Sequence, residues 1–487
     1  MSRFARFFGL EEAPTRAIRF AKILAVLNPT YAMTFSISTT FWLIFIAEQL
    51  GGGDYVAGLA KVGILVVIQL GLQTLLDYPT GALGDHIGQK YVIASAMFCY
   101  ALMFWLSSAV TPMSPYPIFV AIYALFGIAL SQESGAWDAW FDTNFREAYP
   151  NDEGRKQYGV FQGKLGMLFG LANTIVLIPG SWLAYTLGRT WVFQLQAVAY
   201  IILAIIVLRF LNDLPEVQEK RQESRDEGNY IALLREGARF MISDSFIIYI
   251  MAGQILMAAV GMVYGSLILF PFYYLYLISD IATASFRTFM YVPQVPLQDR
   301  SGIWAMKFEP SKWIPRFRLL QIGSTFPLLI MAGLLILLPP PLDATNLLQL
   351  TWPGSSFVLL EVPVESIPAL VVVFILFVFG FLMGTFGGIL TQRVLIDVIP
   401  NKIRNSVYSL QPTLIMITSI PLMLASGEML SNIGFPTTFL ILSAISLFGV
   451  ILIRKSFNYP IPTSVSTPQD YPGEQVEIIE GTPEEIE

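Results

Sequence analysis

A polar stretch between two apolar runs of membrane length reads Leu76-Asp-Tyr-Pro-Thr-Gly81-Ala-Leu-Gly-Asp85-His-Ile-Gly88-Gln-Lys90-Tyr-Val. Its proline and its glycines favour turns and a close approach of the backbone. Asp85 and Lys90 place opposite charges at the ends of the adjoining helices, where helix dipoles and neighbouring charges can hold them. The stretch therefore predicts a tight loop between two membrane helices.

The composition of the chain indicates an integral membrane protein. Of its 487 residues, 55% are hydrophobic and 13% are charged, a balance that a soluble domain of this size would not show. One cysteine and one histidine, Cys99 and His86, cannot build a Cys/His zinc site or a His-containing catalytic triad. The sequence has no Gly-rich phosphate loop and no visible nucleophile–base pair. We therefore expect no enzyme activity, no metal, no cofactor and no nucleic acid partner.

Apolar segments of about 20 residues, the length that crosses a bilayer, recur along the chain. The clear ones are 23–48, 57–80, 91–112, 116–141, 159–184, 191–211, 246–276, 316–338, 367–392, 407–430 and 435–453. A weaker segment at 284–306 is needed as a further crossing, because only then do all loops rich in Lys and Arg lie on one side. That side is the cytoplasm by the positive-inside rule. The sequence thus predicts an all-α membrane protein with twelve transmembrane helices.

An internal repeat divides these helices into two six-helix bundles related by a pseudo-two-fold axis. Residues 301–312 can be aligned with 80–90, and residues 395–404 echo 140–144 and the downstream Arg155. Many transporters are built from such repeats. We expect an N-terminal bundle at 1–212, a cytoplasmic linker with an amphipathic helix at 213–244, a C-terminal bundle at 245–456 and a disordered acidic tail at 457–487.

The spacing Gly81-x3-Asp85-x2-Gly88-x-Lys90 resembles the loop signature between the second and third helices of the major facilitator superfamily of transporters. The resemblance covers roughly residues 20–456. It implies a multi-pass secondary transporter of the plasma membrane, monomeric, with both termini in the cytoplasm and with alternating access to a central site. The family's proton-coupled drug exporters have an arginine in helix 4, which is absent from 123–141 here.

The resemblance implies that Asp85 is a gate residue. It would contact the start of the eleventh helix, near Arg404, when the cytoplasmic side is closed. An aspartate in this position gains charge-assisted hydrogen bonds in one state and loses them in the other. Asp85 could instead only form the turn, and Lys90 could be a positive-inside anchor. The residues that we assign to the gating motif are Gly81, Asp85, Gly88, Lys90, Asp142 and Arg404.

Three acidic residues of helix 4 are the first candidates for chemistry, because a charge in a membrane helix costs a few kcal/mol or more. Ser134, Asp138 and Asp142 fall at i, i+4 and i+8 and form one polar stripe, which should face the bundle interior. Glu133 lies about 140° from Asp138 around the helix, so the two need not serve one site.

Either Glu133 or Asp138 could bind a cation or take up a proton from the central cavity. Lys164 of helix 5 offers the alternative, because it could form a structural ion pair with Asp138 or compete for Glu133. Asp142 lies near the cytoplasmic end, and we expect a structural role for it within reach of Arg155 or of the loop motif.

Helix 8 is the least apolar of the expected helices and contains Arg287, Asp299 and Arg300. One interpretation is that it presents a charged face to the cavity, with an arginine that holds an anionic group of the substrate or senses the proton state of Glu133. The alternatives are that Asp299 and Arg300 neutralise neighbouring helices, or that the segment lies partly outside the membrane.

Polar and aromatic residues on the other central helices complete the expected substrate site. An aromatic cavity with few hydrogen-bonding groups suits a bulky amphiphile. Each residue could also serve packing alone. Those that we assign are Trp42, Gln254 and Tyr264.

These observations favour a proton-coupled secondary transporter of a small organic molecule, with efflux of an amphiphile ahead of nutrient uptake. Its partners would be the lipid bilayer, the substrate and protons. Two alternatives remain open. One is a uniporter or a sodium-coupled symporter of a nutrient, and the other is a non-transporting receptor or scaffold on the same fold.

Overall fold

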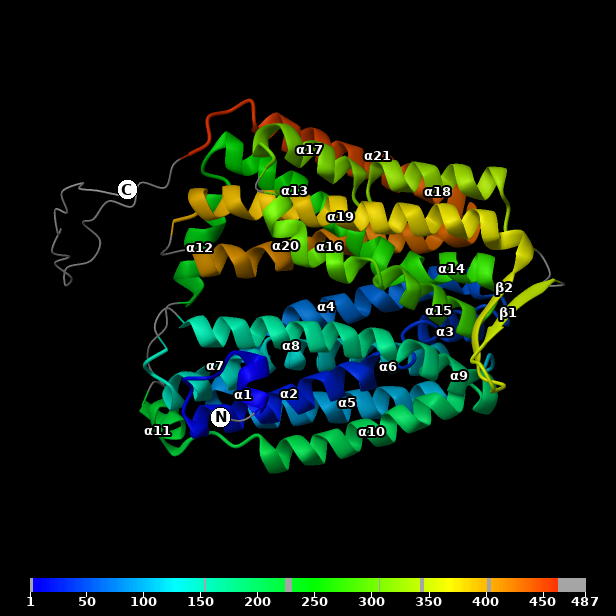
Figure 1. Ribbon diagram of the computed structural model, residues 1–487. Coiled ribbons are helices and arrows are strands. Elements are labelled where there is room, and N and C mark those ends of the chain that lie inside the picture. The colour runs from blue at the N-terminus through cyan, green and yellow to red at the C-terminus, as the bar shows by residue number, and fades with distance from the viewer. Residues whose placement is uncertain are drawn as a thin grey trace, which may run out of the picture.

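The computed structural model describes residues 3–152, 155–223, 230–305, 307–341, 346–400 and 404–462. Its long helices run roughly side by side (Figure 1). One end of the molecule carries the linker helices α11 (Pro215–Glu223) and α12 (Tyr230–Met241), and we call it the linker end. The opposite end carries a β-hairpin, and we call it the hairpin end. The predicted tail at 457–487 lies outside the described residues from 463 onward.

The first half of the chain contributes six crossings. They follow a short helix, α1 (Arg3–Phe8). Their helices are α2 (Thr15–Ser36), α3 (Trp42–Leu50), α4 (Tyr55–Ile87), α5 (Gln89–Ala109), α6 (Tyr116–Glu133), α7 (Ala136–Ala148), α8 (Lys156–Ile175), α9 (Leu177–Leu187) and α10 (Arg189–Phe210).

The second half repeats the pattern after the linker. Its helices are α13 (Ser245–Val263), the π-helical η2 (Tyr264–Ile268), α14 (Leu269–Leu277), α15 (Asp280–Tyr291), α16 (Gln294–Ala305), α17 (Pro310–Leu320), α18 (Thr325–Leu337), α19 (Ile367–Val398), α20 (Arg404–Asn432) and α21 (Gly434–Ser456). The strands β1 (Leu347–Thr351) and β2 (Val358–Pro363) precede a single 3-10 turn, η3 (Val364–Ser366).

Ten segments of the described chain are long and apolar enough to cross a membrane. The pairs α2–α3 and α15–α16 make the first and eighth crossings and complete the twelve that the sequence predicts. Both pairs are interrupted, so neither offers one continuous apolar helix. The weak apolar segment at 284–306 corresponds to α15 and α16, and its last residue, Met306, lies outside the described residues.

The expected loop at 76–92 is wrong in its extent, because α4 continues to Ile87. Pro79 lies inside this helix. Beside it, the Thr80 hydroxyl lies 2.8 Å from the Leu76 carbonyl and 2.8 Å from the Ser131 carbonyl of α6. Such contacts make a proline tolerable in a membrane helix. The turn itself is confined to Gly88, whose φ of 102° suits glycine.

The fourth crossing is also not the continuous helix that the sequence predicts. It breaks at Ser134 and Gly135, and Gly135 takes the left-handed conformation with a φ of 71°. Glu133 thereby ends α6, and Asp138 falls in the first turn of α7. The predicted stripe therefore loses Ser134, while Asp138 and Asp142 still share one face of α7.

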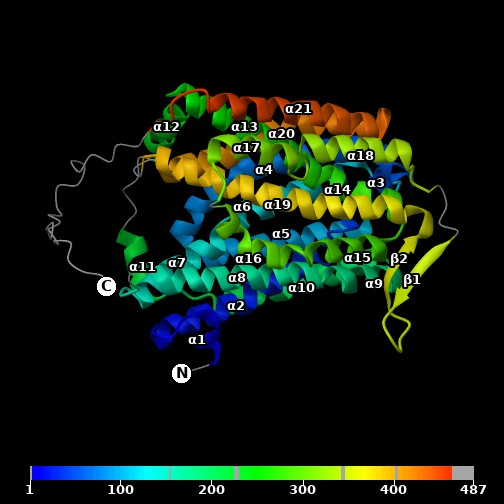
Figure 2. The same cartoon turned by 45° about the horizontal axis from the view of Figure 1, so that its top comes forward.

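The long external link contains a β-hairpin that the sequence analysis did not predict. Strands β1 and β2 pair antiparallel, with Leu348 opposite Val362. Figure 2 shows the hairpin at the end opposite α11 and α12. The ring of Phe357, in the turn, lies 5.0 Å from the ring of Trp182 in α9. A segment of the second half thus rests on the first half.

The two halves meet mainly along two pairs of helices, α4 with α20 and α9 with α15. The first pair is close at two depths. A Cβ added to Gly63 would lie 3.2 Å from the Gly427 Cα. About 16 Å further along α4, the Thr74 hydroxyl lies 3.2 Å from the Met416 sulfur. The second pair involves the helices of the fifth and eighth crossings that lie toward the hairpin end.

Candidate functional site

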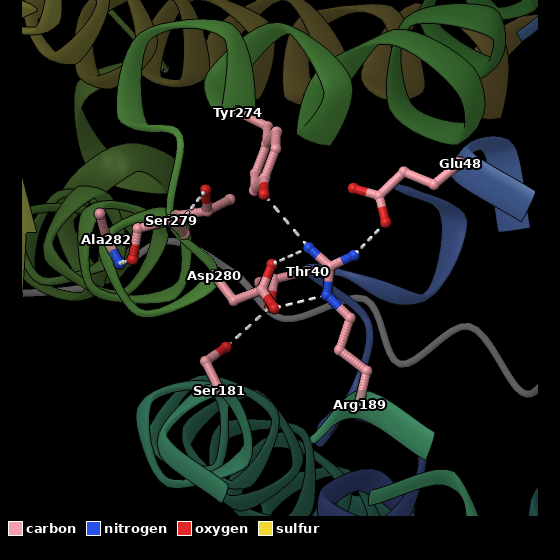
Figure 3. A network of polar contacts seen from close by, with 9 residues as sticks. Thr40, Glu48, Ser181, Arg189, Tyr274, Ser279, Asp280 and Ala282 are labelled. Carbon is pink, nitrogen blue, oxygen red and sulfur yellow. Dashed lines mark hydrogen bonds and ion pairs between the residues drawn. The ribbon is translucent and has the colours of Figure 1, made fainter. Parts of the chain in front are cut away.

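A network of charged groups joins the two halves at the hairpin end (Figure 3). Arg189 of the first half donates to Asp280 of the second half from Nε at 2.7 Å and from Nη2 at 2.8 Å. Its Nη1 donates to Glu48 at 2.5 Å, and its Nη2 also lies 3.3 Å from the Tyr274 hydroxyl. One guanidinium therefore binds two carboxylates and a phenol from three helices.

Local structure positions each member of this network. Gly188, with a φ of 93°, turns the chain so that Arg189 begins α10. Asp280 begins α15, where a negative charge suits the helix dipole, and Ser279 caps the same helix by accepting from the Ala282 amide. Glu48 lies in the last turn of α3.

The network is largely removed from solvent. The side chains of Arg189, Glu48 and Asp280 are 17%, 22% and 13% exposed. Next to it, the Tyr55 hydroxyl donates to the Pro271 carbonyl at 3.3 Å, and the Tyr55 ring lies edge-on to the Tyr274 ring. Polar and aromatic contacts thus link the two halves at the hairpin end.

Glu133 lies among tyrosines at the break in the fourth crossing. Its carboxylate interacts with the Tyr31 hydroxyl of α2. That hydroxyl lies 3.4 Å from the Tyr100 hydroxyl of α5, and the Tyr100 ring stacks on Tyr200 of α10 at 5.0 Å. Within the described ranges, no basic side chain forms an ion pair with Glu133. The side chain can therefore bind a proton without first losing a cationic partner.

Asp138 and Asp142 have different surroundings. Asp138 is exposed and accepts one hydrogen bond, from Gln162 of α8 at 3.3 Å. The alternative ion pair with Lys164 is not formed, because the Lys164 ammonium lies over the Phe7 ring. Asp142 forms ion pairs with Arg146 and Arg155. It therefore ties α7 to the start of α8 near the linker end.

The three residues assigned to the central helices are buried and already have packing partners. Trp42 donates from its indole nitrogen to Ser107 at 3.1 Å. Gln254 donates to Thr391 at 3.1 Å. The Tyr264 hydroxyl lies 3.8 Å from the Met331 sulfur, and Tyr264 begins the π-helical segment η2. π-Helical turns are frequent at functional sites.

The residues of the loop motif lie around the turn between α4 and α5. Asp85 is exposed and accepts from Gln89 at 3.2 Å, and Lys90 donates to Asn212 at 3.2 Å. Gly81 is exposed within α4, and Gly88 makes the turn. Arg404 begins α20, but its side chain lies outside the described part of the chain, so its contact with Asp85 stays a prediction.

In α16, Arg300 is exposed and engaged in a contact, while the side chain of Asp299 is outside the described part. Across the ranges that the structure describes, no group of three or more His, Cys, Asp or Glu side chains could hold a metal ion.

The network at the hairpin end is the part that sequence reasoning missed. Glu48 and Arg189 lie at the outer ends of apolar runs, and Asp280 lies in a short polar interval. Their positions at the same membrane surface follow from the predicted topology. No local signal indicated which of these charges pair.

These features define a polytopic membrane protein built from two six-helix halves. Residues 24–352 match the Major Facilitator Superfamily. The chain therefore belongs to this family, and it is a multi-pass membrane protein with a transporter fold. Among curated proteins, no sequence matches this chain significantly.

Solved structures show the same fold at low sequence identity. A mutant of the nucleoside transporter NupG is 14% identical, with 91% of this chain and 100% of that chain covered and a TM-score of 0.58. A D-xylose-proton symporter is 13% identical, with 90% and 96% covered and a TM-score of 0.56. The xylose transporter XylE from E. coli, in an inward open conformation, is 13% identical, with 92% and 96% covered and a TM-score of 0.50.

Proposed function

We propose that this protein is a proton-coupled secondary transporter that moves a small organic molecule across the plasma membrane by alternating access. It acts as a monomer with both termini in the cytoplasm. Efflux of an amphiphile is favoured over uptake of a nutrient. The observation that carries the proposal is the position of Glu133 among tyrosines at the break of the fourth crossing.

Glu133 has the properties that a coupling group needs. A charge inside a membrane is costly without a partner, so proton binding stabilises a carboxylate that lacks a cation. The break after Glu133 frees backbone groups, which a membrane protein tolerates only within protein or beside water. Protonation can then change together with the side from which the carboxylate is reached.

The orientation of the cycle follows from the basic residues and from the closed hairpin end. Lys and Arg mark cytoplasmic loops. Arg146, Arg155, Lys312 and Arg454 lie toward the linker end, which we therefore assign to the cytoplasm. The network around Arg189 then closes the outer side in this state. Its release is the step that exposes the substrate site to the outside.

The aromatic side chains of the membrane helices support the proposal that the substrate is an amphiphile. The ring centroids of Tyr123 and Phe126 lie 5.1 and 5.4 Å from that of Trp42. Aromatic side chains also surround Glu133. Aromatic surroundings favour a bulky amphiphile. One relative of the same fold is named as a proton symporter, so the fold is compatible with proton coupling.

Reconstituted liposomes provide the test. Compounds are added to vesicles that contain a pH-sensitive dye, and proton movement and compound accumulation are followed with and without an imposed pH gradient. We expect gradient-dependent transport in the wild type and none in Glu133→Gln. Glu309→Gln is the matched control, because Glu309 is exposed and, within the described residues, its side chain pairs with Ser311 and Lys312 of α17, the helix that it caps.

The other outcomes of this experiment separate the alternatives. Transport that is equal with and without a pH gradient, and unchanged in Glu133→Gln, would contradict proton coupling. Transport that requires a sodium gradient would indicate the sodium-coupled symporter. A complete lack of transport, with retained binding of compounds, would favour the receptor or scaffold.

A further inference from the structure

The geometry points to Arg287 as the group that binds the substrate, and to an organic anion, with a carboxylate, sulfonate or phosphate beside an apolar body, as the substrate class. This inference deepens the proposed function and rests on it. It is carried by the place of Arg287 in α15 and by its contacts.

Arg287 lies in α15, the helix that packs against α9 of the other half. It follows Asp280 by seven residues in α15, which is about 10 Å along the axis and nearly two full turns. Residues seven apart share a helix face. Asp280 contacts the first half through Arg189, and Thr288 also reaches it, with its hydroxyl 3.4 Å from the Thr174 carbonyl.

Aromatic rings from two crossings hold the guanidinium of Arg287. It lies 4.3 Å from the Tyr291 ring centroid of its own helix and 4.7 Å from that of Phe377 in α19. It also interacts with Tyr273 of α14 and Tyr264 of η2. The seventh, eighth and tenth crossings therefore meet at this one cation.

The charge of Arg287 lacks an acidic partner. Its Nη2 donates to the Tyr291 hydroxyl, but its Nη1 is buried and makes no hydrogen bond. In the part of the chain that the structure describes, no carboxylate forms an ion pair with it. A partly buried cation without a counter-charge is costly in a membrane. An anionic ligand would offset that cost.

Two other partly buried arginines differ from Arg287 in how their terminal nitrogens are bound. Arg189 is neutralised by Glu48 and Asp280. Arg318 of α17 also has no acidic partner among the described residues, and its Nε is buried without a hydrogen bond, but both of its terminal nitrogens are bound: Nη1 donates to Gln321 at 2.9 Å and Nη2 to Thr391 at 3.3 Å. Its helix packs against α19 and α21 within the second half. Of these three arginines, Arg287 alone has a terminal nitrogen without a hydrogen bond, and it lies on a helix that meets the other half.

The contacts of Arg287 also indicate the shape of the ligand. A guanidinium binds carboxylates and phosphates through parallel hydrogen bonds, and its planar faces here are covered by rings. A ligand must therefore approach its edge with an acidic group. The surrounding Tyr291, Phe377, Tyr273 and Phe286 rings would contact an apolar body.

Ligand-induced thermal stabilisation of the purified full-length protein tests this inference without transport. The probes are paired compounds: benzoate with benzamide, naphthalene-2-sulfonate with 2-naphthol, octanoate with octanol, and phenyl phosphate with phenol. We expect at least one anion to raise the melting temperature of the wild type more than its neutral partner does. Arg287→Gln should remove this preference, and Arg287→Lys should weaken it about tenfold in Kd, because the ammonium makes no bidentate contact.

Arg318→Gln is the matched control, since it removes a partly buried arginine of the same half. We expect it to keep the preference for anions. The inference is overturned if no anion exceeds its neutral partner in the wild type, if the preference survives in Arg287→Gln, or if Arg318→Gln removes it instead. The wild-type comparison decides even if a variant fails to fold. Anion binding without pH-driven transport would refute the proton coupling and leave the anion site standing.

Discussion

Arg189 and Asp280, which begin the sixth and eighth crossings, form a bidentate ion pair with distances of 2.7 and 2.8 Å. The two residues belong to different halves of the protein and are separated by 91 positions in the chain. Charge-assisted bidentate pairs are strong and depend on geometry. This pair therefore fixes how the halves meet at the hairpin end.

Asp280→Asn should open the hairpin end. The substitution removes the charge that accepts both hydrogen bonds, and hydrogen bonds to charged groups contribute about 1.5–3 kcal/mol each. We expect the population of the open state to rise at least about tenfold. The measurement is labelling of Thr288→Cys by a membrane-impermeant maleimide from outside, with the sole cysteine, Cys99, replaced by serine.

Arg16→Gln is the control for this experiment. It breaks the ion pair of Arg16 with Glu216, which lies within the first half and the linker and is 47% and 44% exposed. Its effect on labelling should be small, because exposed ion pairs contribute little. Equal labelling rates in Asp280→Asn and in the unsubstituted background would show that the pair does not close this end.

Glu48→Gln should have a smaller effect than Asp280→Asn. Glu48 accepts one hydrogen bond from Arg189, lies in the same half and has the more exposed side chain of the two carboxylates. Its loss leaves the link between the halves in place. The same labelling experiment checks this order, and a larger rate for Glu48→Gln would contradict it.

Gly180→Ala should destabilise the protein. A Cβ at Gly180 would lie 1.9 Å from the Ile37 carbonyl oxygen, so α9 or the interruption between α2 and α3 must shift. Overpacking of this kind costs about 1–3 kcal/mol. Thermal unfolding in detergent measures the effect. Gly170→Ala is the control in the same crossing, because a Cβ there meets nothing within 4 Å, and a comparable loss in both variants would contradict the steric account.

Phe357→Ala should loosen the hairpin from the first half. The variant loses the ring contact with Trp182, and an aromatic pair contributes about 0.5–1.5 kcal/mol. We expect external labelling of Thr288→Cys to rise about threefold to tenfold. Leu348→Ala, at a position in β1 that is 52% exposed, should leave it unchanged. An equal rise of the labelling rate in both variants would contradict the role of the ring contact. It would indicate that labelling depends on the stability of the hairpin itself.

The number of crossings and their arrangement in two halves could be predicted from the sequence, because apolar length and basic loops report directly on the membrane. The breaks could not. Ser134 and Gly135 are compatible with a continuous helix, and the left-handed conformation of Gly135, which ends the helix there, is not encoded by the apolar pattern. Conversely, Pro79 and Gly81 suggest a turn, but α4 continues through both residues.

The pairing of charges was the least predictable part of the site. Asp142 and Arg155 are close in sequence, so their contact was within reach of the prediction. Lys164 is a plausible partner of Asp138 from the sequence, yet its ammonium lies over the Phe7 ring of α1, a short helix before the first crossing. Arg189 meets Asp280 only because two distant segments reach the same membrane surface.

The close contact between α4 and α20 has a mechanical consequence. Gly63 touches Gly427 near the hairpin end, and Thr74 touches Met416 deeper in the membrane, so this seam is tight over about 16 Å. Tilting one half against the other about such a seam would swap contacts at both ends while the seam itself slides little. In the proposed transport cycle, these two helices would therefore serve as the axis about which the halves rotate, apart from the groups that bind the substrate.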